Sequence, residues 1–286
     1  MIQKLTRAPW WLLVMALGII VFIVWASRDT TYVSVWDAVR EGIWTTIWIS
    51  VTAYALALVL GLLIALLRRS SNIFIYQAVT FYVELVRGIP TLVLVYYLAL
   101  ALIPQIILNI QDLGSSFEHL VVTFNVTGGW SFDLDLGRVG SRMANFETRD
   151  FPNANRAIIA LAVSYSAFLS EVFRAGLDSI SIGQREAARS LGMTRWQVMR
   201  FIVLPQAIRV ILPPLGNDFI AMLKESSLVS VLGVTDITRR GITRATGQFV
   251  FFPVYNIMAI TYLVMTLSLS MAVKLLEMYL DRGQDR

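Results

Sequence analysis

The sequence predicts an all-α integral membrane protein, and three observations support this fold class. Hydrophobic residues make up 57% of the 286 residues and charged residues only 15%, whereas about a quarter of a soluble domain is charged. The apolar residues gather into runs of about 20, the length of helix that crosses the hydrocarbon core of a bilayer. Lysines and arginines lie mainly at the ends of these runs, as they do in multi-pass proteins.

Six stretches are long and apolar enough to span a membrane: Trp10–Ala26, Ile43–Leu67, Ile89–Leu108, Ala157–Ala175, Leu212–Val234 and Val254–Leu276. We therefore divide the chain into an N-terminal transmembrane helix with a connector (1–41) and a core (42–286). The first run follows Lys4 and Arg7, as in a signal peptide, but it is long for one, and we expect a retained helix.

The orientation follows from the distribution of basic residues. Residues 174–209 carry six arginines and two acidic residues, whereas residues 109–155 carry three arginines and six acidic residues. Basic segments stay in the cytoplasm, so six spans place both termini and the loop at about 176–205 in the cytoplasm. The insertion at about 109–155, with His119 and Trp130, falls outside. The segment Gly233–Phe252 is an exception to this rule. It carries three arginines and one aspartate, yet six spans place it outside.

The extracytoplasmic insertion at 109–155 has no strong helical pattern. Polar and apolar residues alternate over Trp130–Leu136, directly after Gly128–Gly129. A short β-hairpin and a solvated loop both fit this pattern.

The sequence lacks the residues that several kinds of functional site require. The chain has no cysteine and one histidine, His119, so thiolate metal sites are excluded and no metal-ligand spacing exists. It contains no Gly-Lys pair, so it has no P-loop for a nucleotide. We expect no enzyme activity and no catalytic residue, metal or cofactor in this chain. The basic residues at the span ends indicate membrane topology rather than nucleic-acid binding.

One cytoplasmic segment, Gly183–Pro205, carries most of the functional argument. Gln184–Leu191 predicts a short helix, with Glu186 in its first turn and Gly192 as its stop. Ala187, Ala188 and Leu191 form a small, smooth face that could enter a groove on another protein. A helix lying on the membrane would show larger apolar residues and lysines instead.

The spacing of this loop resembles that of a known family. Glu186-Ala187-Ala188, then Gly192 after three residues, then Ile202-Val203-Leu204-Pro205 after nine more, is similar to the loop that marks permease subunits of ABC importers. The resemblance implies a coupling helix that docks on an ATP-binding subunit. The residues implied in ATPase coupling are Glu186, Ala187, Ala188, Leu191 and Gly192.

Two further stretches, Glu84–Thr91 and Asn217–Val234, resemble the permeases of the polar amino-acid uptake family. The resemblance covers about Trp44–Leu280, the five-helix core of a type I importer. The N-terminal helix and the long insertion depart from compact members. The resemblance implies a prokaryotic inner membrane, a second permease copy or paralogue, ATP-binding cassette subunits that hold ATP and Mg, an extracytoplasmic solute-binding protein, an amino-acid substrate and no nucleic acid.

Charges inside a membrane are costly and are therefore functional candidates. Glu84 and Arg87 are three residues apart, as are Glu171 and Arg174, so each pair can form along its own helix. These pairs are either structural or part of a cytoplasmic gate, and they could be both.

The fifth span carries a polar strip. Asn217 and Lys224 are seven residues apart, as are Asp218 and Glu225, and Ser226 lies at the end. Each pair repeats on one helix face, and this face cannot point to lipid. It is either the path of a substrate with ammonium and carboxylate groups or a seam between helices.

An ion-gradient-driven secondary transporter or channel is the alternative class. Such proteins often contain inverted repeats and broken helices, and we find no convincing repeat. A secondary transporter or channel would also have no function for an ATPase-docking loop. The sequence is also compatible with a permease-like sensor that docks partners without transport. It does not identify the amino acid, and it fits both a homomeric and a heteromeric permease pair.

Overall fold

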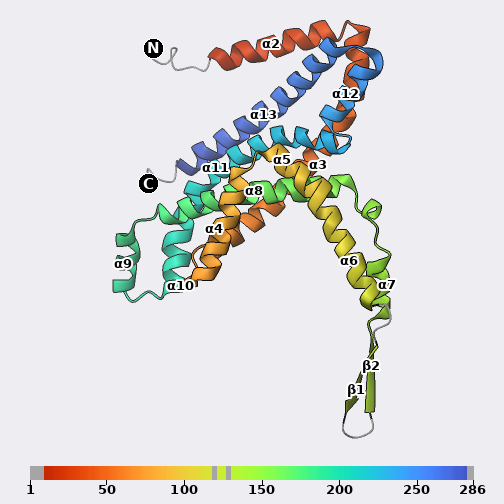
Figure 1. Ribbon diagram of the computed structural model, residues 1–286. Coiled ribbons are helices and arrows are strands. Elements are labelled where there is room, and N and C mark those ends of the chain that lie inside the picture. Colours follow the sequence, from red (N-terminus) through yellow and green to blue (C-terminus); the bar gives the residue numbers. More distant parts are fainter. Residues whose placement is uncertain (1–9, 118–120, 127–129, 282–286) are drawn as a thin grey trace. The chain divides into compact units, whose positions relative to one another are not determined.

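The computed structural model describes residues 10–117, 121–126 and 130–281 (Figure 1). His119, Lys4 and Arg7, which entered the topology argument, lie outside the described residues. The chain forms two compact units, Met1–Trp48 with Gly216–Arg286 (unit 1) and Ile49–Leu215 (unit 2). The boundary expected at residues 41 and 42 falls inside a continuous helix, α3 (Thr30–Leu67).

Unit 1 contains the start of α3 and the end of α11 (Leu204–Glu225). Its other elements are α2 (Trp10–Ala26), the 3-10 helix η4 (Ser226–Leu232), α12 (Ile237–Gln248) and α13 (Phe251–Asp281).

Unit 2 contains the remainder of α3 and of α11 (Leu204–Glu225). Between them run α4 (Ile73–Gly88), α5 (Thr91–Tyr96), the π-helix η1 (Tyr97–Leu102), α6 (Ile103–Phe117), β1 (Val121–Val126), β2 (Trp130–Asp135), α7 (Gly137–Ala144), the 3-10 helix η2 (Thr148–Asp150), α8 (Asn153–Asp178), α9 (Ile182–Ser190), α10 (Arg195–Gln197) and the π-helix η3 (Val198–Val203).

Within the described residues, five helical stretches are long and apolar enough to cross a membrane: Thr30–Leu67, Thr91–Phe117, Asn153–Asp178, Arg195–Leu232 and Phe251–Leu280. Each contains most or all of one expected span. The remaining expected span, α2, is apolar but has 17 residues, which is about 26 Å of helix and close to the lower limit for crossing.

The insertion at 109–155 contains a β-hairpin. Its strands are antiparallel, with Val121 opposite Asp135 and Val126 opposite Trp130, so the hairpin alternative is confirmed. At its base, α6 and α7 pack with almost no space between their backbones. A Cβ on Gly114 would lie 2.4 Å from the backbone nitrogen of Ala144, and glycine permits this close approach.

Two prolines explain the two π-helices. The segment η1 ends two residues before Pro104, and η3 ends two residues before Pro205. Proline has no N–H, so the carbonyl four residues earlier loses its usual donor. A local π turn is one way in which a helix accommodates such a break.

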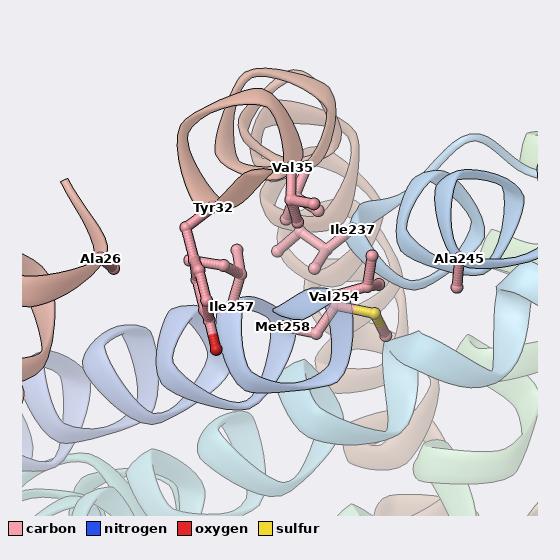
Figure 2. Packing of buried hydrophobic residues seen from close by; sticks show 9 residues of the cluster. Ala26, Tyr32, Val35, Ile237, Ala245, Val254, Ile257 and Met258 are labelled. Atoms are coloured by element: carbon pink, nitrogen blue, oxygen red, sulfur yellow. The ribbon is translucent and has the colours of Figure 1, made fainter. Parts of the chain in front are cut away.

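The core of unit 1 joins four helices, α2 through Ala26, α3, α12 and α13 (Figure 2). Val35 and Val39 of α3 meet Ile237 of α12 and Val254 and Met258 of α13, and all five are buried. This packing fixes one face of α12 against its neighbours.

The start of α12 is held by two polar groups. Oδ1 of Asp236 accepts the N–H of Arg239 at 2.7 Å, and the hydroxyl of Thr46 accepts the N–H of Ile237 at 3.2 Å. A Cβ on Gly42 would lie 2.5 Å from the Asp236 backbone, so α3 and α12 are in direct backbone contact here. These two side chains satisfy N–H groups that a helix start leaves without partners.

We predict that unit 1 becomes less stable as the pH rises through about 6. Burial raises the pKa of the Asp236 carboxyl to about 6, so the folded chain keeps a proton that the unfolded chain releases at lower pH. Stability from this group is therefore full below about pH 4 and is lost towards pH 6 and above, by up to about 3 kcal/mol. Asp236→Asn keeps a capping oxygen without the charge.

Thermal unfolding in detergent at about pH 5 and about pH 8 measures this effect as a difference between wild type and variant. The Asn variant should lose part of the pH dependence, whereas Asp37→Asn, a change of an exposed aspartate on α3, should keep it. Identical pH profiles for wild type and Asp236→Asn would contradict the prediction.

Candidate functional site

The predicted short helix in the loop after α8 exists as α9 and has defined ends. The Ser181 hydroxyl accepts the N–H of Gln184 at its start. At its end, the N–H of Gly192 donates to the carbonyl of Arg189 and the N–H of Met193 to that of Ala188. This is a Schellman motif, and Gly192 has φ +83°, which favours glycine. The expected stop at Gly192 is confirmed.

The two faces of α9 differ from the predicted arrangement. Ala188 is 5% exposed and packs on Leu177, Val198 and Val203, so it faces the chain's own core and not the docking face that we predicted. Helical spacing alone grouped it with Ala187. By contrast, Leu191 at the end of α9 is 84% exposed.

The exposed surface of this segment is defined by Glu186, Ala187 and Leu191, with Ile182 and Trp196 nearby in the sequence. We call it the α9 surface. Three large apolar side chains, Ile182, Leu191 and Trp196, are mostly exposed there. These exposed apolar side chains make the segment a candidate interaction site.

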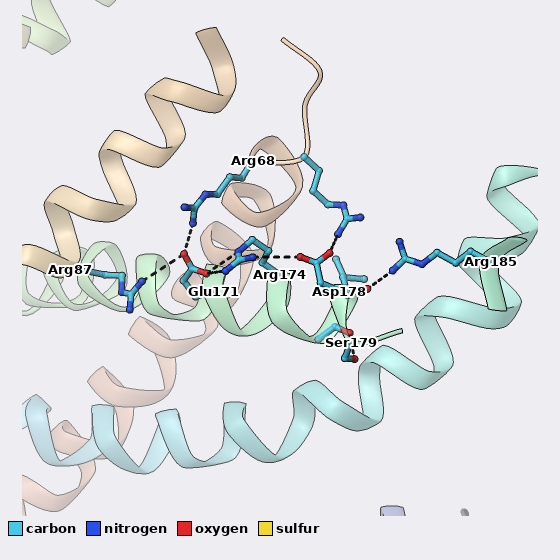
Figure 3. A network of polar contacts seen from close by, with 10 residues as sticks. Arg68, Arg87, Glu171, Arg174, Asp178, Ser179 and Arg185 are labelled. Carbon is cyan, nitrogen blue, oxygen red and sulfur yellow. Dashed lines mark hydrogen bonds and ion pairs between the residues drawn. The ribbon is translucent and has the colours of Figure 1, made fainter. Parts of the chain in front are cut away.

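A network of charged side chains lies beside this segment (Figure 3). The carboxylate of Glu171 on α8 pairs with Arg68, with Arg174 at 2.7 Å and with Arg87 at 3.7 Å. Asp178, two turns along α8, pairs with Arg69 at 2.6 Å and with Arg174 at 3.5 Å. The network therefore ties the end of α3 and the end of α4 to α8.

The expected ion pairs have different outcomes. Glu171 and Arg174 pair as predicted. Arg87 instead contacts Glu171 on another helix, and Glu84 is exposed with no ion pair to any described residue. The sequence analysis missed Arg68, Arg69 and Asp178 as members, although two adjacent arginines directly after a span were a visible signal.

The network also reaches α9. The guanidinium of Arg185 donates to the carbonyl of Leu177 near the end of α8. Together with the packing of Ala188, this contact attaches α9 to the end of α8. Unit 2 thus presents the α9 surface on a support of three helices whose ends are bound together by charge.

The polar strip on α11 is mixed in its exposure. Asn217 and Lys224 are exposed, whereas Asp218 and Glu225 are partly buried. Ser226 is buried, and its hydroxyl donates to the carbonyl of Leu223 at 2.7 Å.

Asp218 stands out within this strip. Its Oδ2 is buried and accepts no hydrogen bond from any described residue. The described ion pairs include none of Asp218, Lys224 and Glu225. A buried carboxylate oxygen without a partner is costly and requires an explanation.

Comparisons with known proteins identify the family of the chain. A family model described as "Binding-protein-dependent transport system inner membrane component" matches residues 57–286. The probable glutamine ABC transporter permease protein GlnM of Bacillus subtilis is 33% identical over 85% of this chain and 93% of its own length. The glutamine transport system permease protein GlnP of Escherichia coli K12 is 31% identical over 85% of this chain and 94% of its own length.

A solved structure is similar too. A chain from the crystal structure of an amino acid ABC transporter with histidines superposes with a TM-score of 0.66 at 32% identity, covering 86% of this chain and 96% of that one. The family model covers most of the sequence, including α9 and the polar strip of α11. The chain therefore belongs to the family of binding-protein-dependent transport system inner membrane components.

Proposed function

We propose that this chain is the membrane-spanning permease subunit of an ATP-driven amino-acid importer. The observation that carries the proposal is the α9 surface, an exposed short helix with the Glu186-Ala187-Ala188 and Gly192 pattern, in a chain of this family. Relatives whose names include glutamine transport support amino acids as the substrate class. Family membership leaves no support for an ion-gradient-driven transporter or channel.

Energy comes from a separate subunit. The chain is not an enzyme, and ATP is hydrolysed by a partner ATP-binding subunit that would hold ATP and Mg. A solute-binding protein delivers the substrate from outside, and a second permease, a copy or a paralogue, would complete the path across the membrane. In this assembly the chain converts closure of the ATPase pair into alternating access.

The attachment of α9 suggests how force passes through the chain. A groove on the ATP-binding subunit would receive Ala187 and Leu191, since small and apolar side chains permit close contact. Displacement of α9 would then act on α8 through the Arg185–Leu177 contact and the buried Ala188. The charge network would carry this displacement to α3 and α4 because Glu171 and Asp178 bind arginines beside those helices.

The substrate path is the second part of the proposal. An amino acid carries an ammonium group, and the unpartnered oxygen of Asp218 is an acceptor for it. Asn217 would serve as a neutral hydrogen-bond partner. Substrate binding would also explain why the chain keeps this costly buried oxygen, because the ammonium group would supply the missing hydrogen-bond partner.

The first prediction of this proposal concerns orientation. Both termini and the loop around Gln184 should be cytoplasmic, and Trp130 should be outside, because of the distribution of basic residues. The natural chain has no cysteine, so single cysteines at positions 184 and 130 can be labelled with a membrane-impermeant thiol reagent. Labelling of position 130 only from the cytoplasmic side would reverse the proposed topology.

The second prediction concerns coupling. Glu186→Lys should reduce ATP-driven transport about tenfold or more while leaving folding intact, since Glu186 is exposed and makes no described ion pair. Transport, ATP hydrolysis and co-purification of the ATP-binding subunit are measured in proteoliposomes. Asp112→Lys, the same charge reversal at an exposed site on α6, is the matched control.

Ala188 offers an internal contrast to that variant. Ala188→Leu should lower the thermal stability of the chain itself, by about 1–3 kcal/mol, because the site is already filled. Normal transport and normal ATPase binding by Glu186→Lys would rule out the docking role of the α9 surface.

The third prediction concerns the substrate. Asp218→Asn should weaken transport about tenfold or more, because a buried charge contact with the ligand is lost. The loss should be greater for a cationic amino acid than for a neutral one, so arginine and glutamine uptake are compared in the same vesicles. ATPase binding should not change. Equal uptake of both amino acids at the wild-type level would move Asp218 to a structural seam.

A further inference from the structure

Unit 1 contains a basic cavity that the transport proposal does not use. Its volume is about 490 Å³, within the usual range for small-ligand sites. It lies beside α12, with one residue of α3 in its wall. The lining residues are Ala38, Thr235, Arg239, Arg240, Thr243, Arg244, Gly247 and Gln248.

The cavity stands on a fixed helix. Ile237, Gly241 and Ala245 recur every four residues on α12 and are buried on its other face, where Ile237 and Ala245 turn towards the core in Figure 2. A Cβ on Gly241 would lie 2.1 Å from the sulfur of Met258, so α12 lies directly on α13. Arg240 and Arg244, one turn apart, therefore project from a helix whose position is set by packing.

The positive charge of the cavity is only partly balanced. Arg240 pairs with Glu41 at 2.5 Å, whereas the described ion pairs include neither Arg239 nor Arg244. The Nε atoms of Arg240 and Arg244 are buried and donate to no described acceptor. Threonine hydroxyls and the Gln248 amide add neutral donors. Guanidinium groups with free donors select oxyanions, phosphate above all.

The position of the cavity in the chain favours a lipid as the source of that oxyanion. Residues 233–250 connect two membrane-spanning helices, which end at Leu232 and begin at Phe251, so the cavity lies near the level of the headgroups. Directly after α12, Phe249 and Phe252 are 82% and 74% exposed. Arginines beside exposed aromatic rings suit an amphipathic ligand with a phosphate and an apolar body.

We propose that this cavity binds the phosphate of an anionic phospholipid headgroup. The proposal also accounts for three arginines in a segment that the charge distribution places outside the cytoplasm, contrary to the usual bias. The proposal requires that the helices on both sides of residues 233–250 span the membrane, and it does not require the transport function.

The test measures phospholipid binding by the full chain in complex with its partner subunits. Phosphatidylglycerol and phosphatidylcholine are added separately to detergent-solubilised protein, and bound lipid is counted by native mass spectrometry. The wild type should retain phosphatidylglycerol in preference. Arg239→Gln combined with Arg244→Gln should weaken this binding about tenfold or more, because two charge-assisted contacts are lost. Arg239→Gln alone, at an exposed side chain, should show a smaller loss and guards against misfolding of the double variant.

Arg40→Gln is the matched control, since Arg40 lies on α3, is exposed and pairs with Asp37 outside the cavity lining. It should bind phosphatidylglycerol as the wild type does. Unchanged binding in the cavity variants, or an equal loss in the control, would overturn the proposal. Loss of binding-protein-stimulated ATP hydrolysis with unchanged lipid binding would assign the cavity to an acidic protein surface. Displacement of the lipid by inorganic phosphate alone, at equal affinity, would assign it to free phosphate.

Discussion

The constraint on which this structure depends is the need of every backbone N–H and C=O in hydrocarbon to find a partner within the protein. Apolar runs supply the lipid-facing surface, but the backbone groups left unpaired at the ends and interruptions of the helices each need a local hydrogen-bond partner. Asp236 and Thr46 cap the first turn of α12, and the Schellman motif closes α9 at Gly192. Two of the prolines within the spans, Pro104 and Pro205, are each preceded by a π turn. Backbone pairing thus fixes the start of α12 and the end of α9.

Side-chain charge has a different task in the two units. In unit 2, two carboxylates hold four arginines, and the excess of positive charge remains within a network that joins three helices. In unit 1, Glu41 neutralises one of the three arginines that line the cavity, Arg240. Exposed ion pairs add little stability individually, so the main effect of the network is to hold the helix ends in position. It fixes the support from which α9 projects.

The amino-acid sequence predicted the membrane-spanning helices well, since a run of about 20 apolar residues has one good solution in a bilayer. It also predicted α9 and its glycine stop. It did not separate the two faces of α9, because spacing shows which residues share a face but not which face is buried, and Ala188 was placed on the wrong one. Nor could it find the pairing of Arg68 with Glu171, which are far apart in the chain. The same limitation produced the expected Glu84–Arg87 pair, where Arg87 has a partner on α8 instead.

The π turn before Pro205 has a consequence for the phase of the helix that follows. An α-helix advances about 100° per residue, and a π turn accommodates one additional residue without breaking the helix. All side chains of α11 after η3 are therefore rotated by about that angle relative to an uninterrupted helix. Removing one residue from Val198–Val203 would restore α-helical winding and keep Asp218 on its present face, whereas α-helical winding of the full sequence would turn Asp218 to a neighbouring face. The direction in which the polar strip faces is thus set by the π turn before Pro205, a proline that lies twelve residues ahead of Asn217.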